Sequence, residues 1–490
     1  MPFSAYKRDL FFNLLLLIAL CVILTSKPSV LSAQGFSIDP SISVSQEYSD
    51  NINQEQEKLP DFTTRIMPKL DLNHDARHWD LSISYAFEYL YYARKNKKVS
   101  GGFTQDDTRH TLNARGLANL VPNLFFLDVR NDYRRTDLNL VRSSYVLVEP
   151  EVPVEEEPVP VIFPGDEILV PQYEEVTSRE REVSDRNNFL ISPYIELRPS
   201  VRTELRTGYR YRNTWYERDE VQDVDIHEIF MNGVYDLTAR INLNAGYTGT
   251  WRRNRDGESD VFVDEADIGE FFIEELRRES PSRQGRENRH TVYGGASYAY
   301  GPGSRIHGDY GTTWRRYSDR NTTTNPYWNV GITHAFSTVT ATLRTGVTYV
   351  EDPLRDASRR QISHVASLNR PYARGNIRVF ASSTEYNEPD DSRYSIGFAL
   401  QHGLTRLLTG TAGVTYNNRK EERFILVDSV PERSENKIDE WRLGLGLIRP
   451  LGRNFTASLN YFYIDSSSNI PLSNDNFREN RVILMLRKTF

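Results

Sequence analysis

Between residues 202 and 212, five of the six alternate positions carry charged side chains, and the sixth is Gly208. The row consists of Arg202, Glu204, Arg206, Arg210 and Arg212. Guanidinium and carboxylate groups bind charged and hydrophilic groups through ion pairs and hydrogen bonds. A spacing of two places side chains on one face of a β-strand. The row therefore predicts a polar field along a wall rather than a closed catalytic pocket.

The nine histidines form no catalytic or metal-binding motif. His74 and His78 are four residues apart, but they lie in a predicted turn, whereas zinc-binding pairs at that spacing lie on a helix. GxSxG, P-loop and dinucleotide-binding motifs are also missing from the sequence. We therefore predict no catalytic residue, no metal and no cofactor, and we expect the protein not to be an enzyme.

The charged row belongs to a predicted antiparallel hairpin over residues 189–211. Phe189, Ile191, Ile195 and Leu197 share one face of its first arm. Residues 198–200 form a turn, and the apolar and aromatic residues of the second arm occupy the face opposite the charged row. A sandwich strand can also show a polar face to water, so this hairpin alone leaves the fold open.

The same two-residue alternation recurs along the chain after residue 34. Short turns rich in Gly, Pro, Ser and Thr alternate with long polar loops, two of which are predicted over residues 93–107 and 418–437. That alternation is typical of outer-membrane barrels, which have tight periplasmic turns and longer external loops. We predict an all-β protein with one domain over residues 34–490. It would be a single antiparallel transmembrane β-barrel of about 20 strands, within a range of 18–22.

Aromatic residues cluster where the predicted strands enter the long loops. Amphipathic rings suit the headgroup boundary of a membrane, so we predict an aromatic girdle there. Its members are Tyr91, Tyr133, Tyr211, Tyr247, Trp251, Tyr310, Trp314, Tyr349, Tyr416 and Tyr463. The chain ends on Phe490, which resembles the signal read by the barrel-assembly machinery.

Residues 1–33 are predicted to be a secretory signal peptide. Lys7 and Arg8 precede an apolar core over residues 10–24, and small residues follow it. The chain's one cysteine, Cys21, lies within that core, so no disulfide framework is expected. The formal net charge of −7 disfavours nucleic acid as a partner.

Two long loops stand apart from the others. The loop over residues 136–186 is acidic and rich in proline, which favours extended chain. It is either a solvated external loop or one that folds inward and narrows the lumen. The loop over residues 252–288 has apolar residues at helical spacing, which is consistent with a short amphipathic helix.

The opening segment over residues 36–52 resembles the start of the β-barrel porin family 2. The resemblance rests on Pro40, Tyr48, Asp50 and Asn51, and on later strands that end in Tyr-x-Tyr pairs. These outer-membrane proteins are often associated with exopolysaccharide and exosortase systems. The resemblance implies a barrel in the outer membrane and polysaccharide-export components as partners. It supplies no catalytic residues.

Together these observations predict an outer-membrane, porin-like pore for hydrophilic solutes or exported polysaccharide. Membrane lipid, lipopolysaccharide and the barrel-assembly machinery are its expected partners. One alternative is a barrel that conducts nothing and presents its loops as a platform for polysaccharide or a partner. Another is an outer-membrane hydrolase. Catalytic sites of that kind are assembled in space from single residues, so the lack of a sequence motif does not exclude one.

Overall fold

The structure is a computed structural model, and it describes residues 35–99, 102–138, 183–218, 221–255, 286–317, 322–353, 357–387, 390–427, 430–452, 454–470 and 475–490. It contains one 20-stranded antiparallel sheet and one small hairpin. The strands are β1 Phe36–Ser49, β2 Asp61–Ala76, β3 Trp79–Tyr92, β4 Lys97–Val99, β5 Gly102–Thr104, β6 Asp106–Val121, β7 Phe125–Asp137, β8 Val183–Ser200, β9 Thr203–Tyr216, β10 Val224–Thr238, β11 Ile241–Asn254, β12 Arg286–Gly301, β13 Ser304–Tyr317, β14 Thr323–Ala335, β15 Thr340–Asp352, β16 Ala357–Tyr372, β17 Gly375–Tyr386, β18 Asp391–Gly403, β19 Thr409–Val427, β20 Val430–Pro450, β21 Phe455–Ser468 and β22 Phe477–Thr489.

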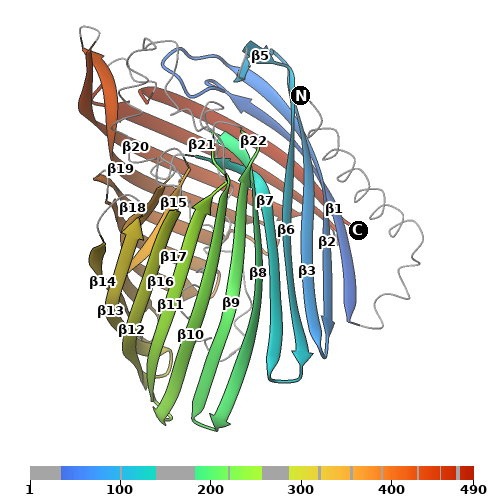
Figure 1. The fold of residues 1–490 in the computed structure, drawn as a ribbon. Helices are drawn as coiled ribbons and strands as arrows, with labels where there is room; N and C mark the ends of the chain where they lie inside the picture. Colours follow the sequence, from blue (N-terminus) through green and yellow to red (C-terminus); the bar gives the residue numbers. More distant parts are fainter. Residues whose placement is uncertain are drawn as a thin grey trace, which may run out of the picture.

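The large sheet closes on itself. Each of its strands pairs with the next one in the chain, apart from the small β4–β5 hairpin, which interrupts the succession between β3 and β6. The first strand then pairs with the last, from Ser41↔Thr489 to Ser49↔Arg481. The wall consequently has no free first or last strand (Figure 1). The predicted all-β, closed antiparallel barrel of about 20 strands is confirmed.

The two faces of the wall differ in chemistry. Positions facing outward carry large apolar side chains that remain exposed, such as Val44, Leu343 and Leu445. Positions facing the lumen carry polar or charged side chains, many of them buried, such as Ser43 and Arg210. Because side chains of a strand alternate between its faces, one period-2 sequence pattern produces both surfaces.

Connections at the two ends of the barrel differ in length. Turns such as residues 77–78, 201–202 and 373–374 form what we call the short-turn end, and the longer connections form the long-loop end. Part of the predicted loop over residues 93–107 forms the β4–β5 hairpin. The predicted loop over residues 418–437 is instead largely strand, because β19 and β20 continue to pair as far as Val427↔Val430.

Several predictions fall outside the described residues. They are the signal peptide over residues 1–33, the acidic part of the 136–186 loop and the helix in the 252–288 loop. The flanks of both loops are strand, since β7 ends at Asp137, β8 begins at Val183, β11 ends at Asn254 and β12 begins at Arg286. No helix in the described part of the chain is long and apolar enough to cross a membrane.

Prolines within strands lie where the hydrogen-bond ladder is interrupted. Pairing of β2 with β3 skips Pro68, and pairing of β8 with β9 skips Pro193. Pro326 lies in a part of β14 that pairs with β13 but not with β15. Proline has no N–H to donate to a neighbouring strand, so it is tolerated where one neighbour is missing.

Candidate functional site

The row of charged residues divides into a wall part and a turn part. Arg206 lies over Tyr194, with its guanidinium carbon 3.9 Å from the ring centroid. Arg210 is buried and its Nη1 lies 2.6 Å from Oε1 of Glu228. Both arginines therefore face the lumen, where they pack on aromatic rings, and Arg210 also pairs with a carboxylate.

The other three members of the row lie at or near its two ends. Arg202 lies in the β8–β9 turn, where its backbone N–H donates to Oγ of Ser200 at 3.2 Å. Oε2 of Glu204, at the start of β9, lies 3.3 Å from Nη2 of Arg198. Arg212 pairs in register with Leu190 of β8 on the lumen face. The row thus runs from the short-turn end up the inside of β9.

Four predicted girdle tyrosines have hydroxyls anchored to aspartates near the long-loop end. The hydroxyl groups of Tyr133, Tyr211, Tyr416 and Tyr463 lie 3.1, 2.7, 2.5 and 3.3 Å from carboxylate oxygens of Asp185, Asp225, Asp439 and Asp465, respectively. A ring held in this way keeps its polar tip at the aqueous side and its apolar body on the outer surface, which is the arrangement expected of a membrane boundary.

The remaining girdle residues occupy varied surroundings. Tyr91, Tyr310 and Trp314 are exposed on the outer surface. Trp251 stacks edge-on against His290, with ring centroids 5.7 Å apart. Tyr349 differs from the others, because the guanidinium carbon of lumen-facing Arg289 lies 4.4 Å from its ring centroid.

Five histidines share an arrangement that the sequence reasoning missed. Each faces outward and lies within hydrogen-bonding distance of a tyrosine hydroxyl, usually on a neighbouring strand. The pairs are Tyr85–His110, Tyr209–His227, Tyr247–His290, Tyr300–His334 and Tyr372–His402, with O···Nδ1 distances between 2.6 and 3.0 Å. A partnered imidazole satisfies part of its hydrogen-bonding capacity on an otherwise apolar surface. The sequence held a signal for these contacts, because each of these histidines lies at a position of its strand that faces outward.

Strands β14 and β15 pair with each other over only part of their length. The two strands pair from Ala335↔Thr340 only as far as Asn329↔Gly346. Beyond that point β14 continues along β13 to Arg315↔Thr323, while β15 continues along β16 to Asp352↔Ala357. The strands have therefore parted over the half of the wall nearest the long-loop end.

After this parting, β15 and β16 lie against the inside of the wall. We call residues 347–352 of β15 and 358–361 of β16 the inward segment. Glu351 has the outward phase of β15, yet its Oε2 lies 2.5 Å from Nε of Arg252, which faces the lumen from β11. Nη1 of Arg289, on β12, donates to Oγ of Ser358 at 3.1 Å. An outward face can meet lumen-facing residues only if the inward segment lies within the barrel.

Further contacts hold the inward segment in place. Nη2 of Arg315, on β13, donates to the backbone carbonyl of Ser358. Nη2 of Arg360 donates to the carbonyl of Pro326 at 3.3 Å, across the place where the strands part. These contacts bridge β13 and β14 to β16 without strand pairing, so side chains replace the missing ladder.

Arg359 anchors the inward segment to the next part of the wall. Its Nη1 lies 3.1 Å from Oδ2 of Asp352 and 2.8 Å from Oδ2 of Asp391. All three side chains are at most 1% exposed. Two buried carboxylates thus share one buried guanidinium, an arrangement that is stable only while every partner is present.

Burial on the lumen face is concentrated near the long-loop end. Asn436 and Glu479 are fully buried there. Arg344, which faces the lumen nearer the short-turn end, is exposed. Among the described residues, the lumen is therefore filled by side chains toward the long loops and more open toward the short turns.

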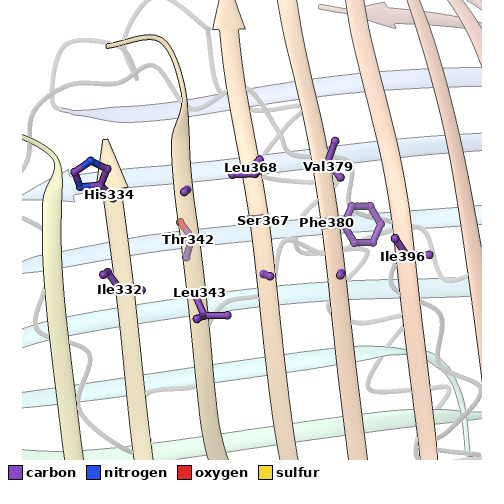
Figure 2. Close-up of a pocket in the computed structure, with 12 residues that line it drawn as sticks. Ile332, His334, Thr342, Leu343, Ser367, Leu368, Val379, Phe380 and Ile396 are labelled. Atoms are coloured by element: carbon purple, nitrogen blue, oxygen red, sulfur yellow. The ribbon is translucent and has the colours of Figure 1, made fainter. Parts of the chain in front are cut away.

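The outer surface carries a shallow apolar depression of about 390 Å³ across β14–β18. Figure 2 shows Ile332, Leu343, Leu368, Val379 and Ile396 among its lining residues. Alanines on β15, β16 and β17 lie between these larger side chains. An apolar hollow on the outward face fits a lipid-facing surface, and the one titratable side chain in its lining, His334, is paired with the hydroxyl of Tyr300. Among the described residues, no group of three or more His, Cys, Asp or Glu side chains could hold a metal ion.

The C-terminal residue lies at the closing seam of the barrel. The backbone N–H of Phe490 donates to the carbonyl of Pro40 at 3.0 Å. Its ring is exposed, and Nζ of Lys488 lies 4.4 Å from the ring centroid. Phe490 is therefore presented on the outside, at the short-turn end.

Comparison with solved structures returns large bacterial barrels. OccAB3 of Acinetobacter baumannii aligns with 93% of this chain and 100% of its own, with 10% identity and a TM-score of 0.39. The FrpB iron transporter of Neisseria meningitidis aligns over 95% and 83%, with 9% identity and a TM-score of 0.44. A mutant of the ferric enterobactin receptor PfeA of Pseudomonas aeruginosa aligns over 93% and 80%, with 8% identity and a TM-score of 0.46. The likeness concerns the barrel fold alone.

No protein-family model matches the sequence, and no curated protein does either. The resemblance to the β-barrel porin family 2 therefore stays a prediction.

Proposed function

We propose that the chain is an outer-membrane pore for hydrophilic solutes, narrowed near its external mouth by the inward segment. The observation that carries the proposal is the opposition of the two faces of a closed wall. Its outside is apolar and exposed, as at Leu343 and Leu445, and its inside is polar and charged, as at Arg210 and Arg344. An apolar outside suits lipid, and a charged lumen suits water and polar solutes.

Orientation in the membrane follows from the loops and rings. Tight turns lie on the periplasmic side and longer loops on the external side in barrels of this kind. The anchored tyrosines at the long-loop end support an interface there. Under this orientation, the filled part of the lumen and the inward segment lie at the external mouth. The resemblance at residues 36–52 extends the proposal to exported polysaccharide as a second cargo.

Conductance across a planar lipid bilayer tests the proposal. The refolded barrel should give discrete current steps in potassium chloride. A correctly folded barrel that stays silent would instead support the platform alternative, in which the loops bind polysaccharide or a partner and nothing crosses. Our proposal contains no catalytic step, so a hydrolytic activity that maps to the lumen would also contradict it.

A pair of variants tests separately whether the inward segment narrows the pore. Glu351→Gln removes the charge that pairs with Arg252 and should loosen the inward segment, so the current steps should grow or flicker more often. Glu204→Gln removes a lumen carboxylate that is partly exposed nearer the short turns, so it serves as the matched control. Identical current traces for the two variants would mean that the inward segment does not limit conduction.

A further inference from the structure

The apolar depression on the outer surface has a floor of small side chains. Ala341, Ala366 and Ala381 lie on the adjacent strands β15, β16 and β17 and line the depression. Ala366 pairs in register with Leu343 on one side and with Ala381 on the other. A methyl group projects less far from a sheet than the branched apolar side chains around it. The register of three strands thus produces a hollow of about 390 Å³.

The edge of the depression nearest the short-turn end is polar. His334 of β14 lies at this edge (Figure 2), and its Nδ1 is 3.0 Å from the hydroxyl oxygen of Tyr300. Arg370 of β16 is exposed and lies two residues beyond Leu368, which lines the depression. Residues two apart in a strand share a face, so Arg370 also faces outward. An arginine and a histidine–tyrosine pair therefore border an apolar hollow on one side.

The chain around this edge contains no acidic residue. Asp and Glu are absent from four stretches that include the short turns between β14 and β15, β16 and β17, β18 and β19, and β20 and β21, namely residues 326–350, 361–384, 392–420 and 441–464. Arg370 forms no ion pair with any described residue, and Arg374 and Arg406 in the neighbouring turns are also exposed. Arg198, at the β8–β9 turn, instead contacts two carboxylates. The short-turn end is consequently positive beside the depression.

An apolar hollow with cations along one edge is complementary to an amphiphile with an acyl chain and an anionic headgroup. Guanidinium groups bind phosphate through two parallel hydrogen bonds, and histidine and tyrosine can add further ones. Ala366 and Arg370 are four residues apart, about 13 Å along a strand. The hydrocarbon core of one leaflet is about 15 Å thick. A lipid whose chain fills the hollow would therefore bring its phosphate to Arg370.

We propose that the depression and Arg370 form a binding site for an anionic glycerophospholipid of the periplasmic leaflet. One acyl chain lies over Ala366, and the phosphate pairs with Arg370 and receives a hydrogen bond from the His334–Tyr300 pair. The choice of leaflet rests on the orientation given under the proposed function, but binding itself requires no conduction. The site crosses the seam where β14 and β15 pair only from Ala335↔Thr340 to Asn329↔Gly346, so the bound lipid would hold these two strands together.

Native mass spectrometry of the refolded barrel in detergent tests the headgroup part of the site. Phosphatidylglycerol and phosphatidylcholine with the same acyl chains are the probes, and the barrel should bind phosphatidylglycerol more tightly. Arg370→Gln should weaken that binding by about fivefold, the effect of one basic residue on attraction to an anionic lipid surface. Arg449→Gln is the matched control, because Arg449 is an exposed outward arginine of β20 that does not border the depression. It should bind phosphatidylglycerol as the parent does.

A second pair of variants tests the apolar part. Ala366→Leu fills the hollow and should weaken the binding of phosphatidylglycerol, whereas Ala296→Leu, on the outward face of β12, should leave it unchanged. Arg370→Lys retains the charge and should still prefer phosphatidylglycerol, which covers the case in which Arg370→Gln does not fold. The water-soluble headgroup analogue sn-glycerol 3-phosphate lacks acyl chains and should not displace the lipid.

Four results would overturn the site. They are equal affinity for the two lipids, equal losses in Arg370→Gln and Arg449→Gln, unchanged binding in Ala366→Leu, and displacement of the lipid by sn-glycerol 3-phosphate. Current steps from a barrel with no preference for phosphatidylglycerol would overturn this site and leave the pore intact. Selective lipid binding by a silent barrel would contradict the pore and support the site.

Discussion

Removal of Arg359 should destabilise the barrel more than removal of any exposed arginine. Its guanidinium is the shared partner of Asp352 and Asp391, and all three side chains are almost completely buried. Arg359→Met retains much of the apolar stem but removes the guanidinium that two buried carboxylates share. Breaking a buried ion pair by deleting one partner costs about 3–5 kcal/mol of unfolding free energy. We expect a loss in that range.

Urea unfolding in lipid vesicles, followed by tryptophan fluorescence, measures this loss. Arg198→Met is the matched control, because Arg198 also contacts two carboxylates, Glu196 and Glu204, but is 68% exposed. Exposed ion pairs contribute about 0–1 kcal/mol, so the control should unfold nearly as the parent does. Equal losses for the two variants, or a loss below about 1 kcal/mol for Arg359→Met, would refute the reasoning.

Rescue provides a sharper form of the same experiment. Replacing Asp352 and Asp391 with Leu in the Arg359→Met background removes the orphaned charges along with the guanidinium. Buried ion clusters replaced by apolar groups of similar size often regain their stability. The triple variant should therefore be more stable than Arg359→Met alone. A further loss would mean that Arg359 acts through its packing against neighbouring rings instead of through charge.

Two smaller predictions concern backbone contact and pH. Gly311→Ala should lower stability because its new Cβ would meet the backbone of β12, whereas Gly413→Ala should be neutral because its nearest contact is at 3.5 Å; urea unfolding compares them, and equal effects would contradict the close approach. Burial alone would raise the pKa of Asp50 in the β1–β2 loop, but hydrogen bonds from Lys58 and Asn480 outweigh burial and lower the pKa. The lowered pKa stabilises the fold at pH values above the ordinary carboxyl pKa of about 3.9. That stabilisation is lost as the pH falls through the pKa of Asp50 in the folded protein. The stability gap between the parent and Asp50→Asn should therefore shrink on acidification, and a gap that widens would contradict this.

Much of the architecture could be predicted from the alternation of residue types. The two-residue period specifies which side chains share a face, and alternating short and long connections specify the hairpins. These patterns were sufficient to predict the closed barrel and its approximate strand number. They predicted the end of β19 and the start of β20 wrongly, because charged residues outside a membrane can continue a strand without an apolar face.

The inward segment could not be predicted from the same pattern. Tyr349 and Glu351 keep the outward phase of β15, and nothing in their spacing indicates that their strand lies inside the wall. One clue was present in Pro326, since a proline within a strand favours a place with one neighbour missing. The cross-strand pairing of Arg393 with Arg419 was also hidden, because it depends on the register between two strands.

Stability in lipid vesicles of two adjacent arginine variants tests the central claim, that the wall has one face for lipid and one for water. Ala381 and Ser382 are neighbours at the middle of β17, where Ala381 is exposed on the outward face and Ser382 faces the lumen. Ala381→Arg should cost about 2–4 kcal/mol of unfolding free energy, as a charge on the lipid face near the bilayer centre does. Ser382→Arg should cost clearly less, because its charge would face water. Equal costs, or a larger cost for Ser382→Arg, would contradict the account.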